Sequence, residues 1–212
     1  LWLPAAYANT SAPVAALFAI MTKVGAYSIL RMHTLVFGGD AGPLANLYEP
    51  WLLPLALATL ILGMIGAVAA ASLGRMAAYF VIASVGTLLL AFGLGSSDAI
   101  AAGLYYLPHS TFVTATFFLL IDALAKRRGL HADKLTVAAD MPQSWLWGSL
   151  YLALAVLLAG LPPLSGFLGK FLLLKSALDH SWLIPVWVVV LLTALLGLIV
   201  LARAGSMLFL RG

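Results

Sequence analysis

Long apolar runs dominate this sequence and restrict it to a membrane-embedded protein. Crossing about 30 Å of hydrocarbon takes about 20 apolar residues in an α-helix, and lipid admits only helices or closed barrels. Of the 212 residues, 64% are hydrophobic and 8% are charged, with a mean hydropathy of +1.10. Soluble domains carry about 25% charged residues. A soluble domain and a disordered tail are therefore excluded, and we expect an all-α, polytopic bundle of transmembrane helices.

Six of these runs are long enough to cross a membrane. They lie at about residues 12–35, 50–72, 75–96, 98–124, 145–178 and 182–208. The fifth is too long for one straight span, and it contains the helix-breaking residues Gly160, Pro162, Pro163, Gly166 and Gly169. Proline removes a backbone donor and clashes with the preceding turn. Two short helices joined by a tight turn would also fit, but we predict one discontinuous helix broken near mid-membrane, as in the ion sites of transporters.

The distribution of basic residues supports this count. The 125–144 loop carries Lys126, Arg127, Arg128 and Lys134. With one broken helix, Arg75 and Arg211 fall on the same side, and the opposite loops hold Asp40, Glu49, Asp98 and Asp179. A strong bias of lysine and arginine marks the cytoplasmic side. We therefore predict a multi-pass protein of the bacterial cytoplasmic membrane with the 125–144 loop in the cytoplasm.

The sequence lacks the features that are typical of several other classes of protein. There is no cysteine, and the four histidines are scattered without metal-ligand spacing. The segment GFLGKF lacks the spacing and the hydroxyl residue of a phosphate-binding loop. No basic face exists to follow a nucleic-acid backbone, although the pI is near 9.5. We expect no enzyme activity, metal or cofactor in this chain.

The domain organisation is expected to be simple. The chain begins at Leu1 without the features of a signal peptide. We interpret it as the later portion of a longer polypeptide. Residues 1–11 are expected to form a loop that follows a preceding helix, and residues 12–212 a single transmembrane domain.

Two lysines stand in the middle of apolar helices and are the first candidates for function. Lys23 lies in ALFAIMTKVGAYSILR, and Lys170 follows the predicted break in LPPLSGFLGKFLLLK. A charge in the centre of a span costs about 2.5 to 17 kcal/mol, and such residues mark ion or proton pathways. The structural alternative is a lysine that caps backbone carbonyls of a neighbouring helix. The predicted break, with Pro162, Pro163 and Gly166, leaves backbone groups free and is a plausible gate beside Lys170.

His109 is the third candidate, one residue after Pro108 in GLYYLPHSTFVTATFFLL. Tyr105, His109 and Thr116 share a helix face at offsets of four and seven. Histidine titrates near neutral pH and can relay protons. The alternative is a neutral histidine bonded to a helix carbonyl.

Three further residues are possible accessories. Asp122 precedes Lys126 by four residues, so it forms either a helix-surface ion pair or a point of proton uptake at the cytoplasmic mouth. Tyr27 lies one turn beyond Lys23 and is positioned to orient it. Lys175 lies towards the outer face, where a long side chain can extend to the headgroups.

Three segments resemble a known family. WLPAAYANTSAPVAALFAIMTKVGAYSILR, YYLPHSTFVTATFFLL and GLPPLSGFLGKFLLL are similar to segments of antiporter-like membrane subunits. That family includes the proton-pumping subunits of respiratory complex I and the large subunits of Mrp-type multisubunit cation/proton antiporters. The details MTKVGAY, LPHSTFVTA and GLPPLSGFLGK are most similar to the D subunits of Mrp antiporters. The resemblance runs over nearly the whole chain.

The resemblance implies a fold of about fourteen transmembrane helices in two inverted repeats. This chain would supply the last helix of the first repeat and the second repeat. Lys23 would match the central lysine between two half-channels, His109 the histidine of the connecting polar axis, and Lys170 the lysine of the second half-channel. The implied activity is proton translocation coupled to movement of Na⁺ or K⁺, within a complex of other membrane subunits.

Two departures from the family pattern bear on this reading. Several complex I members place a lysine four residues after the histidine, where this chain has Val113. The family's glutamate–lysine pair of the first half-channel would precede Leu1, and the single glutamate here, Glu49, is expected in a loop. A proton-pumping subunit of a complex I-like oxidoreductase or membrane-bound hydrogenase is the first alternative. A structural subunit without transport activity is the second.

Overall fold

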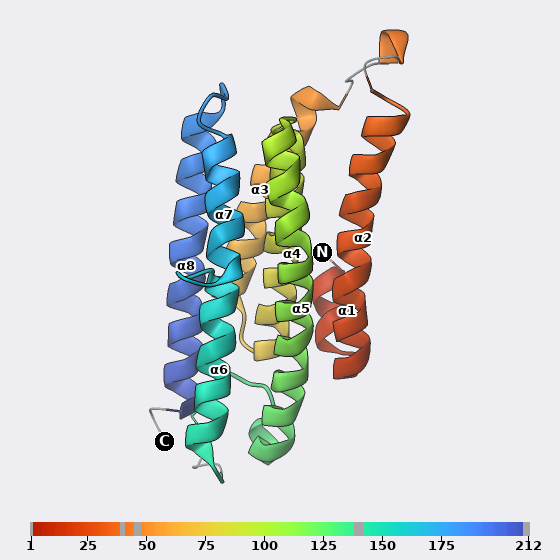
Figure 1. Ribbon diagram of the computed structural model, residues 1–212. Helices are drawn as coiled ribbons and strands as arrows, with labels where there is room; N and C mark the ends of the chain where they lie inside the picture. The colour runs from red at the N-terminus through yellow and green to blue at the C-terminus, as the bar shows by residue number, and fades with distance from the viewer. Residues whose placement is uncertain (1, 39–40, 45–47, 138–141, 210–212) are drawn as a thin grey trace.

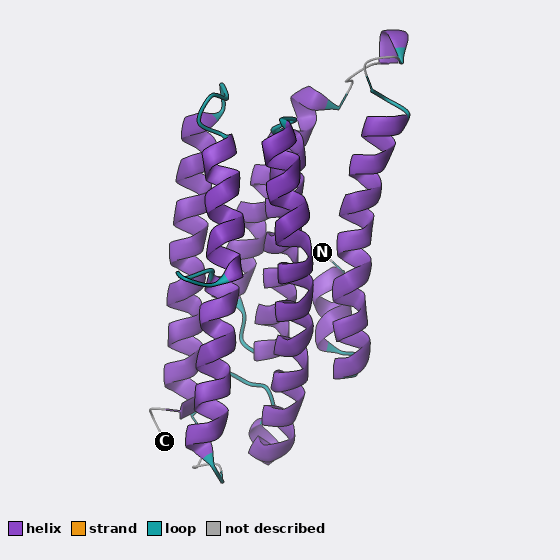
Figure 2. Ribbon diagram, in the orientation of Figure 1, coloured by secondary structure: helices purple, strands orange, loops and turns teal. Residues whose placement is uncertain are grey.

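The protein is a bundle of α-helices in a computed structural model that describes residues 2–38, 41–44, 48–137 and 142–209 (Figures 1 and 2). The helices are α1 (Leu3–Ala8), α2 (Ala12–Leu35), α3 (Glu49–Ala69), α4 (Leu73–Gly93), α5 (Ser97–Arg128), α6 (Ser144–Ala159), α7 (Ser165–Ser176) and α8 (Leu183–Phe209). Two single 3₁₀ turns, η1 (Gly42–Leu44) and η2 (Gly129–His131), lie in the connections.

The predicted all-helical membrane bundle is confirmed. Helices α2, α4, α5 and α8, and residues 50–69 of α3, are long and apolar enough to cross a membrane. The fifth apolar run forms α6 and α7, which follow one another end to end and are separated by residues 160–164 (Figure 1). The interrupted pair therefore crosses the bundle once, as one discontinuous helix.

Helix α1 is a difference from the sequence-based expectation. The sequence predicts a loop over residues 1–11, but Leu3–Ala8 is helical, with Pro4 in its first turn. Proline favours this position because its fixed φ suits a helix start and its missing N–H costs nothing there. Tyr7 is buried, and its hydroxyl donates a hydrogen bond to the Phe18 carbonyl at 2.6 Å. This hydrogen bond of Tyr7 thus links α1 to α2.

Helix α4 lies at the centre of the bundle. In its most apolar stretch 72% of the residues are buried, against 22% in α8. In Figure 1, helices α6, α7 and α8 lie on one side of it and α1 and α2 on the other. Helices α3 and α4 approach closely because Gly63 and Gly86 face the opposite backbone. The outer faces of α2, α3 and α8 expose many leucine, isoleucine and valine side chains, as lipid-facing helices do.

The loop after α5 is folded against α4. Arg128, counted above among the loop charges, is buried and donates hydrogen bonds to the carbonyls of Ala132, Lys134 and Thr136. The Asp133 carbonyl accepts from Leu73 N–H at 2.8 Å, and its Oδ2 accepts from Gly74 N–H at 3.1 Å. These bonds satisfy backbone groups in the first turn of α4. The described part of this loop is therefore a fixed cap on that end of the bundle.

Candidate functional site

Two of the three candidate residues meet at the break between α6 and α7. Lys170, in the second turn of α7, donates a hydrogen bond from Nζ to the carbonyl of Ala159 at 2.9 Å. His109 lies on α5, which packs along α7, and its Nδ1 is 2.7 Å from Ser165 Oγ at the start of α7. Both side chains are half-buried. The structure thus brings a lysine and a histidine from different helices to one break.

The His109 ring also reaches the other half of the broken helix. The backbone of Leu157 in α6 is a hydrogen-bond partner of the ring. Gly166 leaves room for this contact, because a Cβ there would lie 2.6 Å from His109 Nε2 and 2.9 Å from the Leu157 carbonyl oxygen. Since Nδ1 is engaged by Ser165, the nitrogen that faces Leu157 is Nε2. His109 therefore contacts α6 and α7 at once.

These two side chains satisfy backbone groups that the break leaves open. Helix α6 ends at Ala159 because Gly160 takes a left-handed conformation, with φ of +75°. The last four carbonyls of a helix lack intrahelical partners, and in a membrane each must find another. Gly160 N–H donates to the carbonyls of Val156 and Leu157. Lys170 donates a hydrogen bond to the Ala159 carbonyl. Backbone carbonyls at the break are therefore bonded to side chains that can gain or lose protons.

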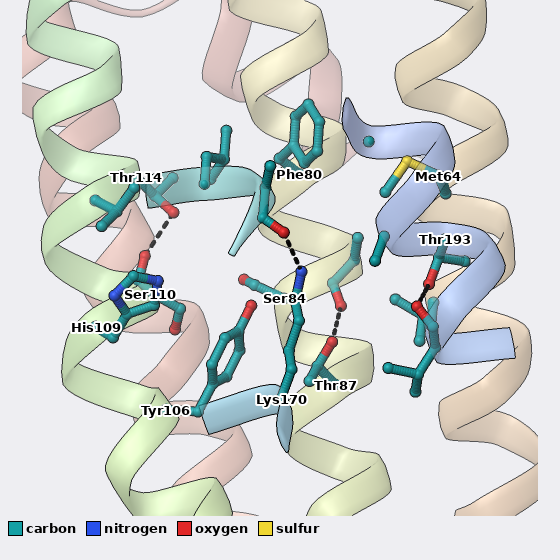
Figure 3. Close-up of a pocket in the computed structure, with 18 residues that line it drawn as sticks. Met64, Phe80, Ser84, Thr87, Tyr106, His109, Ser110, Thr114, Lys170 and Thr193 are labelled. Carbon is teal, nitrogen blue, oxygen red and sulfur yellow. Dashed lines mark hydrogen bonds between the residues drawn. The ribbon is translucent and has the colours of Figure 1, made fainter. Parts of the chain in front are cut away.

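A small cavity of about 30 Å³ adjoins Lys170 and His109, large enough for about one or two water molecules (Figure 3). Its polar lining includes hydroxyl groups from α4, α5 and α8: Ser84, Thr87, Ser110, Thr114 and Thr193. Each of these hydroxyls donates to a carbonyl one turn earlier on its own helix, at 2.6 to 3.1 Å. Their oxygens remain as acceptors for a water molecule or an ammonium group.

These hydroxyl residues were missed in the sequence analysis. The spacing of small polar residues within apolar runs could have identified them. Ser84 and Thr87 are three residues apart, and Ser110 and Thr114 are four residues apart. Such spacing places both members of a pair on one helix face. Thr193 has no second small polar residue within one turn of its span and carries no such signal. It joins the cavity only because α8 packs against α3 and α6.

Lys23 lies away from the break, on α2. Its side chain is 1% exposed, and its Nζ has no hydrogen-bond partner within the described part of the chain. Helix α2 packs against α5 and α4, and in Figure 1 α5 lies between α2 and α7. Lys23 is therefore a buried, unpaired ammonium among the described residues, separated from His109 and Lys170 by the thickness of α5.

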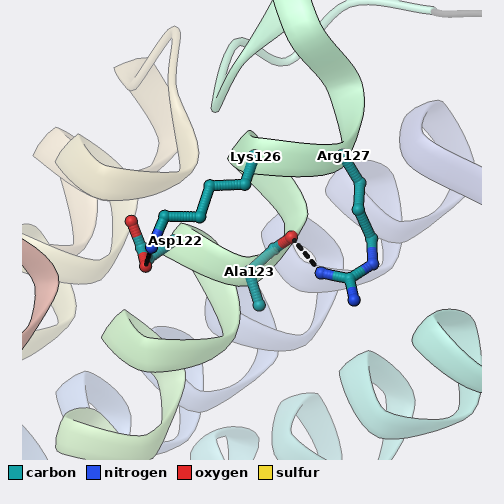
Figure 4. A network of polar contacts seen from close by, with 4 residues as sticks. All are labelled: Asp122, Ala123, Lys126 and Arg127. Atoms are coloured by element: carbon teal, nitrogen blue, oxygen red, sulfur yellow. Dashed lines mark hydrogen bonds and ion pairs between the residues drawn. The ribbon is translucent and has the colours of Figure 1, made fainter.

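The accessory candidates lie outside this site. Asp122 and Lys126 form a surface ion pair at 2.6 Å, and Arg127 donates to the Ala123 carbonyl at 3.0 Å (Figure 4). Exposed pairs of this kind contribute little to stability. Tyr27 is 40% exposed, and Lys175 is also exposed. The structure therefore brings none of the three accessory residues to the break.

The polar stripe expected on α5 is only partly present. Tyr105 is 40% exposed and Thr116 is exposed, whereas His109 is half-buried. Buried Tyr106 faces His109 instead, with ring centroids 5.7 Å apart. Thr116 lies about two helical turns, or about 10 Å, beyond His109 along α5, so sharing a face with His109 does not bring it to the break.

Known proteins are similar to this chain in sequence, and a solved structure is similar to it in fold. A protein of Rhizobium meliloti (strain 1021), described as the probable D subunit of a K⁺/H⁺ antiporter, is 41% identical over 84% of this chain and 36% of its own length. The D subunit of the Na⁺/H⁺ antiporter from Alkalihalophilus pseudofirmus is 36% identical over 86% of this chain and 36% of its own length. The chain thus spans about a third of the length of these curated relatives.

A solved structure gives the same result. The Mrp complex from Dietzia sp. DQ12-45-1b contains a chain that superposes with a TM-score of 0.85 at 29% identity, covering 98% of this chain and 38% of that one. Residues 1–197 match the family model described as "NADH:quinone oxidoreductase/Mrp antiporter, TM". Because this match covers most of the sequence, the chain belongs to the NADH:quinone oxidoreductase/Mrp antiporter transmembrane family.

Proposed function

We propose that this chain is part of a membrane component of a multisubunit monovalent cation/proton antiporter. It moves protons through Lys23, His109 and Lys170, coupled to movement of Na⁺ or K⁺. The relatives described as D subunits of K⁺/H⁺ and Na⁺/H⁺ antiporters support this class of activity. The other membrane subunits of the same complex are its partners, and the bacterial cytoplasmic membrane is its location.

One observation carries the proposal: both titratable side chains at the break hydrogen-bond to the interrupted helix. Lys170 Nζ donates to the Ala159 carbonyl, and His109 contacts Ser165 and the Leu157 backbone. A lysine that releases its proton loses a donor of its charge-assisted bond, and a histidine that gains one acquires a second donor. Proton movement at either residue therefore changes the bonds that hold α6 to α7. In this proposal the break is the gate.

The cavity supports a water-mediated route beside the gate. Its hydroxyl oxygens are acceptors next to Lys170, and its volume fits about one or two waters. In this proposal Lys23 belongs to the same proton route but lies farther from the break, on the other side of α5. A buried charge costs several kcal/mol to maintain, and the described residues give the Lys23 ammonium no hydrogen bond that offsets this cost. This cost favours a role in transport over a role in packing.

Experiments can distinguish two alternatives from the cation/proton antiporter proposed here. The family description includes NADH:quinone oxidoreductases, so the same scaffold in a redox-driven complex is one alternative. A structural subunit is the other, and the bond from Lys170 to the Ala159 carbonyl gives it a specific basis, because that bond joins two helices. The structural alternative predicts loss of assembly when Lys170 is replaced.

Replacement of Lys170 tests the proposal directly. We expect Lys170→Ala in the full-length complex to lower cation-driven proton exchange in everted vesicles about tenfold or more, a change of about 1.4 kcal/mol per decade in the activation free energy. Native gels should show intact complex. Lys175→Ala, at an exposed lysine five residues further on the same helix, is the matched control and should exchange normally.

Two results would contradict the transport role. Normal exchange in Lys170→Ala would remove Lys170 from the pathway. Loss of the complex on native gels would support the structural alternative. Proton exchange that requires an electron donor and quinone, and no Na⁺ or K⁺, would favour the redox-driven complex.

A further inference from the structure

Ser165 is a half-buried contact of the gate that the proposed pathway does not use. It is the first residue of α7, and its hydroxyl lies 2.7 Å from Nδ1 of His109, 56 residues earlier in the chain. The five serine and threonine hydroxyls that line the cavity bond to carbonyls of their own helices. The hydroxyl of Ser165 instead meets a titratable ring from another helix.

The neighbours of the ring determine which nitrogen carries its proton. A neutral histidine has one N–H donor and one acceptor nitrogen, and the hydrogen-bond network assigns them. The Leu157 carbonyl can only accept, so the nitrogen that faces it, Nε2, carries the hydrogen. Nδ1 is then the acceptor, and it receives the hydrogen of the Ser165 hydroxyl.

Protonation of the ring reverses the second of these bonds. The added proton can bind only at Nδ1, because Nε2 already carries a hydrogen. Nδ1–H then donates to Ser165 Oγ, and the serine hydrogen rotates towards another acceptor. A hydroxyl is both donor and acceptor, so the ring keeps a partner on each nitrogen in both states. Alanine at this position would leave Nδ1 without a protein partner at the break.

We propose that Ser165 is a positioning residue for His109: its hydroxyl reverses its hydrogen bond as the ring gains or loses a proton, so that the ring stays in the break. This inference rests on the proposed function, because it assumes that His109 changes its protonation state during transport. Ser165 acts through His109 and need not contact the transported ion. Within the part of the chain that the structure describes, Lys170 and Tyr106 are the other titratable groups that face the ring.

The test compares variants that differ in the hydroxyl at position 165, in the full-length complex. Threonine and valine have nearly the same shape, so Ser165→Thr against Ser165→Val isolates the hydroxyl. We expect Ser165→Ala and Ser165→Val to lower cation-driven proton exchange about fivefold, the effect of one lost hydrogen bond. Ser165→Thr should exchange as wild type does. Ser176→Ala is the control on α7, because that hydroxyl bonds to the Leu173 carbonyl one turn earlier on the same helix.

A spectroscopic readout separates positioning from a packing effect. In complex labelled with ¹⁵N in the histidine rings, His109 signals are assigned by their absence in His109→Ala. We expect the wild type to show hydrogen on Nε2 and a hydrogen-bonded acceptor at Nδ1. Ser165→Ala should keep the hydrogen on Nε2, which faces Leu157, but show an Nδ1 signal without the hydrogen bond. An unchanged His109 spectrum in Ser165→Ala overturns the inference, whatever the transport rate. So does equal exchange by the threonine, valine and alanine variants and the wild type.

Failure of the proposed transport function would give different experimental results from failure of the inference about Ser165. If His109→Ala exchanges normally and assembles on native gels, His109 is not on the pathway and the proposed function loses that residue. The ring spectrum would still report whether the Ser165 hydroxyl is hydrogen-bonded to Nδ1. If His109→Ala is defective and Ser165→Ala is normal in both exchange and spectrum, only the inference about Ser165 fails.

Discussion

At the scale of single residues, Gly166 sets how tightly the gate is packed. An added Cβ would lie 2.6 Å from His109 Nε2 and 2.9 Å from the Leu157 carbonyl oxygen, closer than real Cβ atoms approach either group. We expect Gly166→Ala to displace the ring and to lower cation-driven proton exchange about tenfold, since a misplacement of about 1 Å can cost 10²-fold.

The matched control for Gly166→Ala is Gly148→Ala on α6. The atoms nearest to a Cβ at Gly148 belong to the Phe209 side chain, at 3.6 Å, which is an ordinary contact. Gly148→Ala should exchange as the wild type does. If Gly166→Ala also exchanged normally, the close approach of His109 to the break would have no role in transport.

The sequence was sufficient to select Lys170 and His109, because a charge or a titratable ring within an apolar run is rare for energetic reasons. It was not sufficient for Ser165 or Thr193. A serine or threonine costs little within a helix, since its hydroxyl can bond to its own backbone. Only the packing of the helices around the break brings Ser165 to His109 and Thr193 to the cavity.

At the scale of helices, Gly86 and Gly63 hold α3 and α4 together. A Cβ on Gly86 would lie 2.7 Å from the backbone nitrogen of Leu60, and one on Gly63 would lie 2.7 Å from that of Ala83. Both obstacles are backbone atoms, which cannot rotate away. We expect Gly86→Ala to separate the two helices and to destabilise the complex by about 1–3 kcal/mol, measured as a lower thermal midpoint in detergent.

Gly25→Ala on α2 provides the comparison for Gly86→Ala. Among the described residues, no atom beyond the adjacent residues and the nearby backbone of α2 lies within 4 Å of a Cβ at Gly25, so this replacement adds only the better helix propensity of alanine. Its thermal midpoint should equal or exceed that of the wild type. A thermal midpoint for Gly86→Ala similar to that of the wild type would mean that α3 and α4 can move apart without loss of stability.

Helix positions are largely predictable from the sequence, and the misses have physical causes. The apolar run at 12–35 coincides with α2. The run at 98–124 ends before α5 does, because α5 continues to Arg128. Its last turn is charged and adds no hydrophobic signal, yet the Asp122–Lys126 pair and the bond from Arg127 to the Ala123 carbonyl support it. The run at 50–72 extends three residues past α3, because apolar alanines continue beyond Ala69.

At the scale of the whole molecule, the bundle places the described part of the 125–144 loop and the turn between α7 and α8 at opposite ends (Figure 1). This chain has no cysteine, so single cysteines can report which end faces the cytoplasm. In a full-length protein otherwise free of cysteine, we expect a membrane-impermeant maleimide to label Asp179→Cys in intact cells. His131→Cys should be labelled only in everted vesicles. Both positions are exposed.

The reverse labelling pattern would contradict the assignment of the basic loop to the cytoplasm. Labelling of both positions from the same side would contradict a single crossing by the interrupted helix. A positive control is the same pair of variants in detergent, where both cysteines should react.

The interruption between α6 and α7 also has an electrical consequence. A helix end carries a partial charge of about half an elementary charge, negative at the C-terminus and positive at the N-terminus. The Lys170 ammonium lies on the Ala159 carbonyl at the negative end of α6, and residues 144–176 contain no aspartate or glutamate. A backbone dipole cannot be neutralised by acid as a carboxylate can. The part of the attraction for a cation that comes from the end of α6 therefore does not depend on pH, whereas a proton gained by His109 at the same break opposes it. That part weakens when the two half-helices move relative to each other.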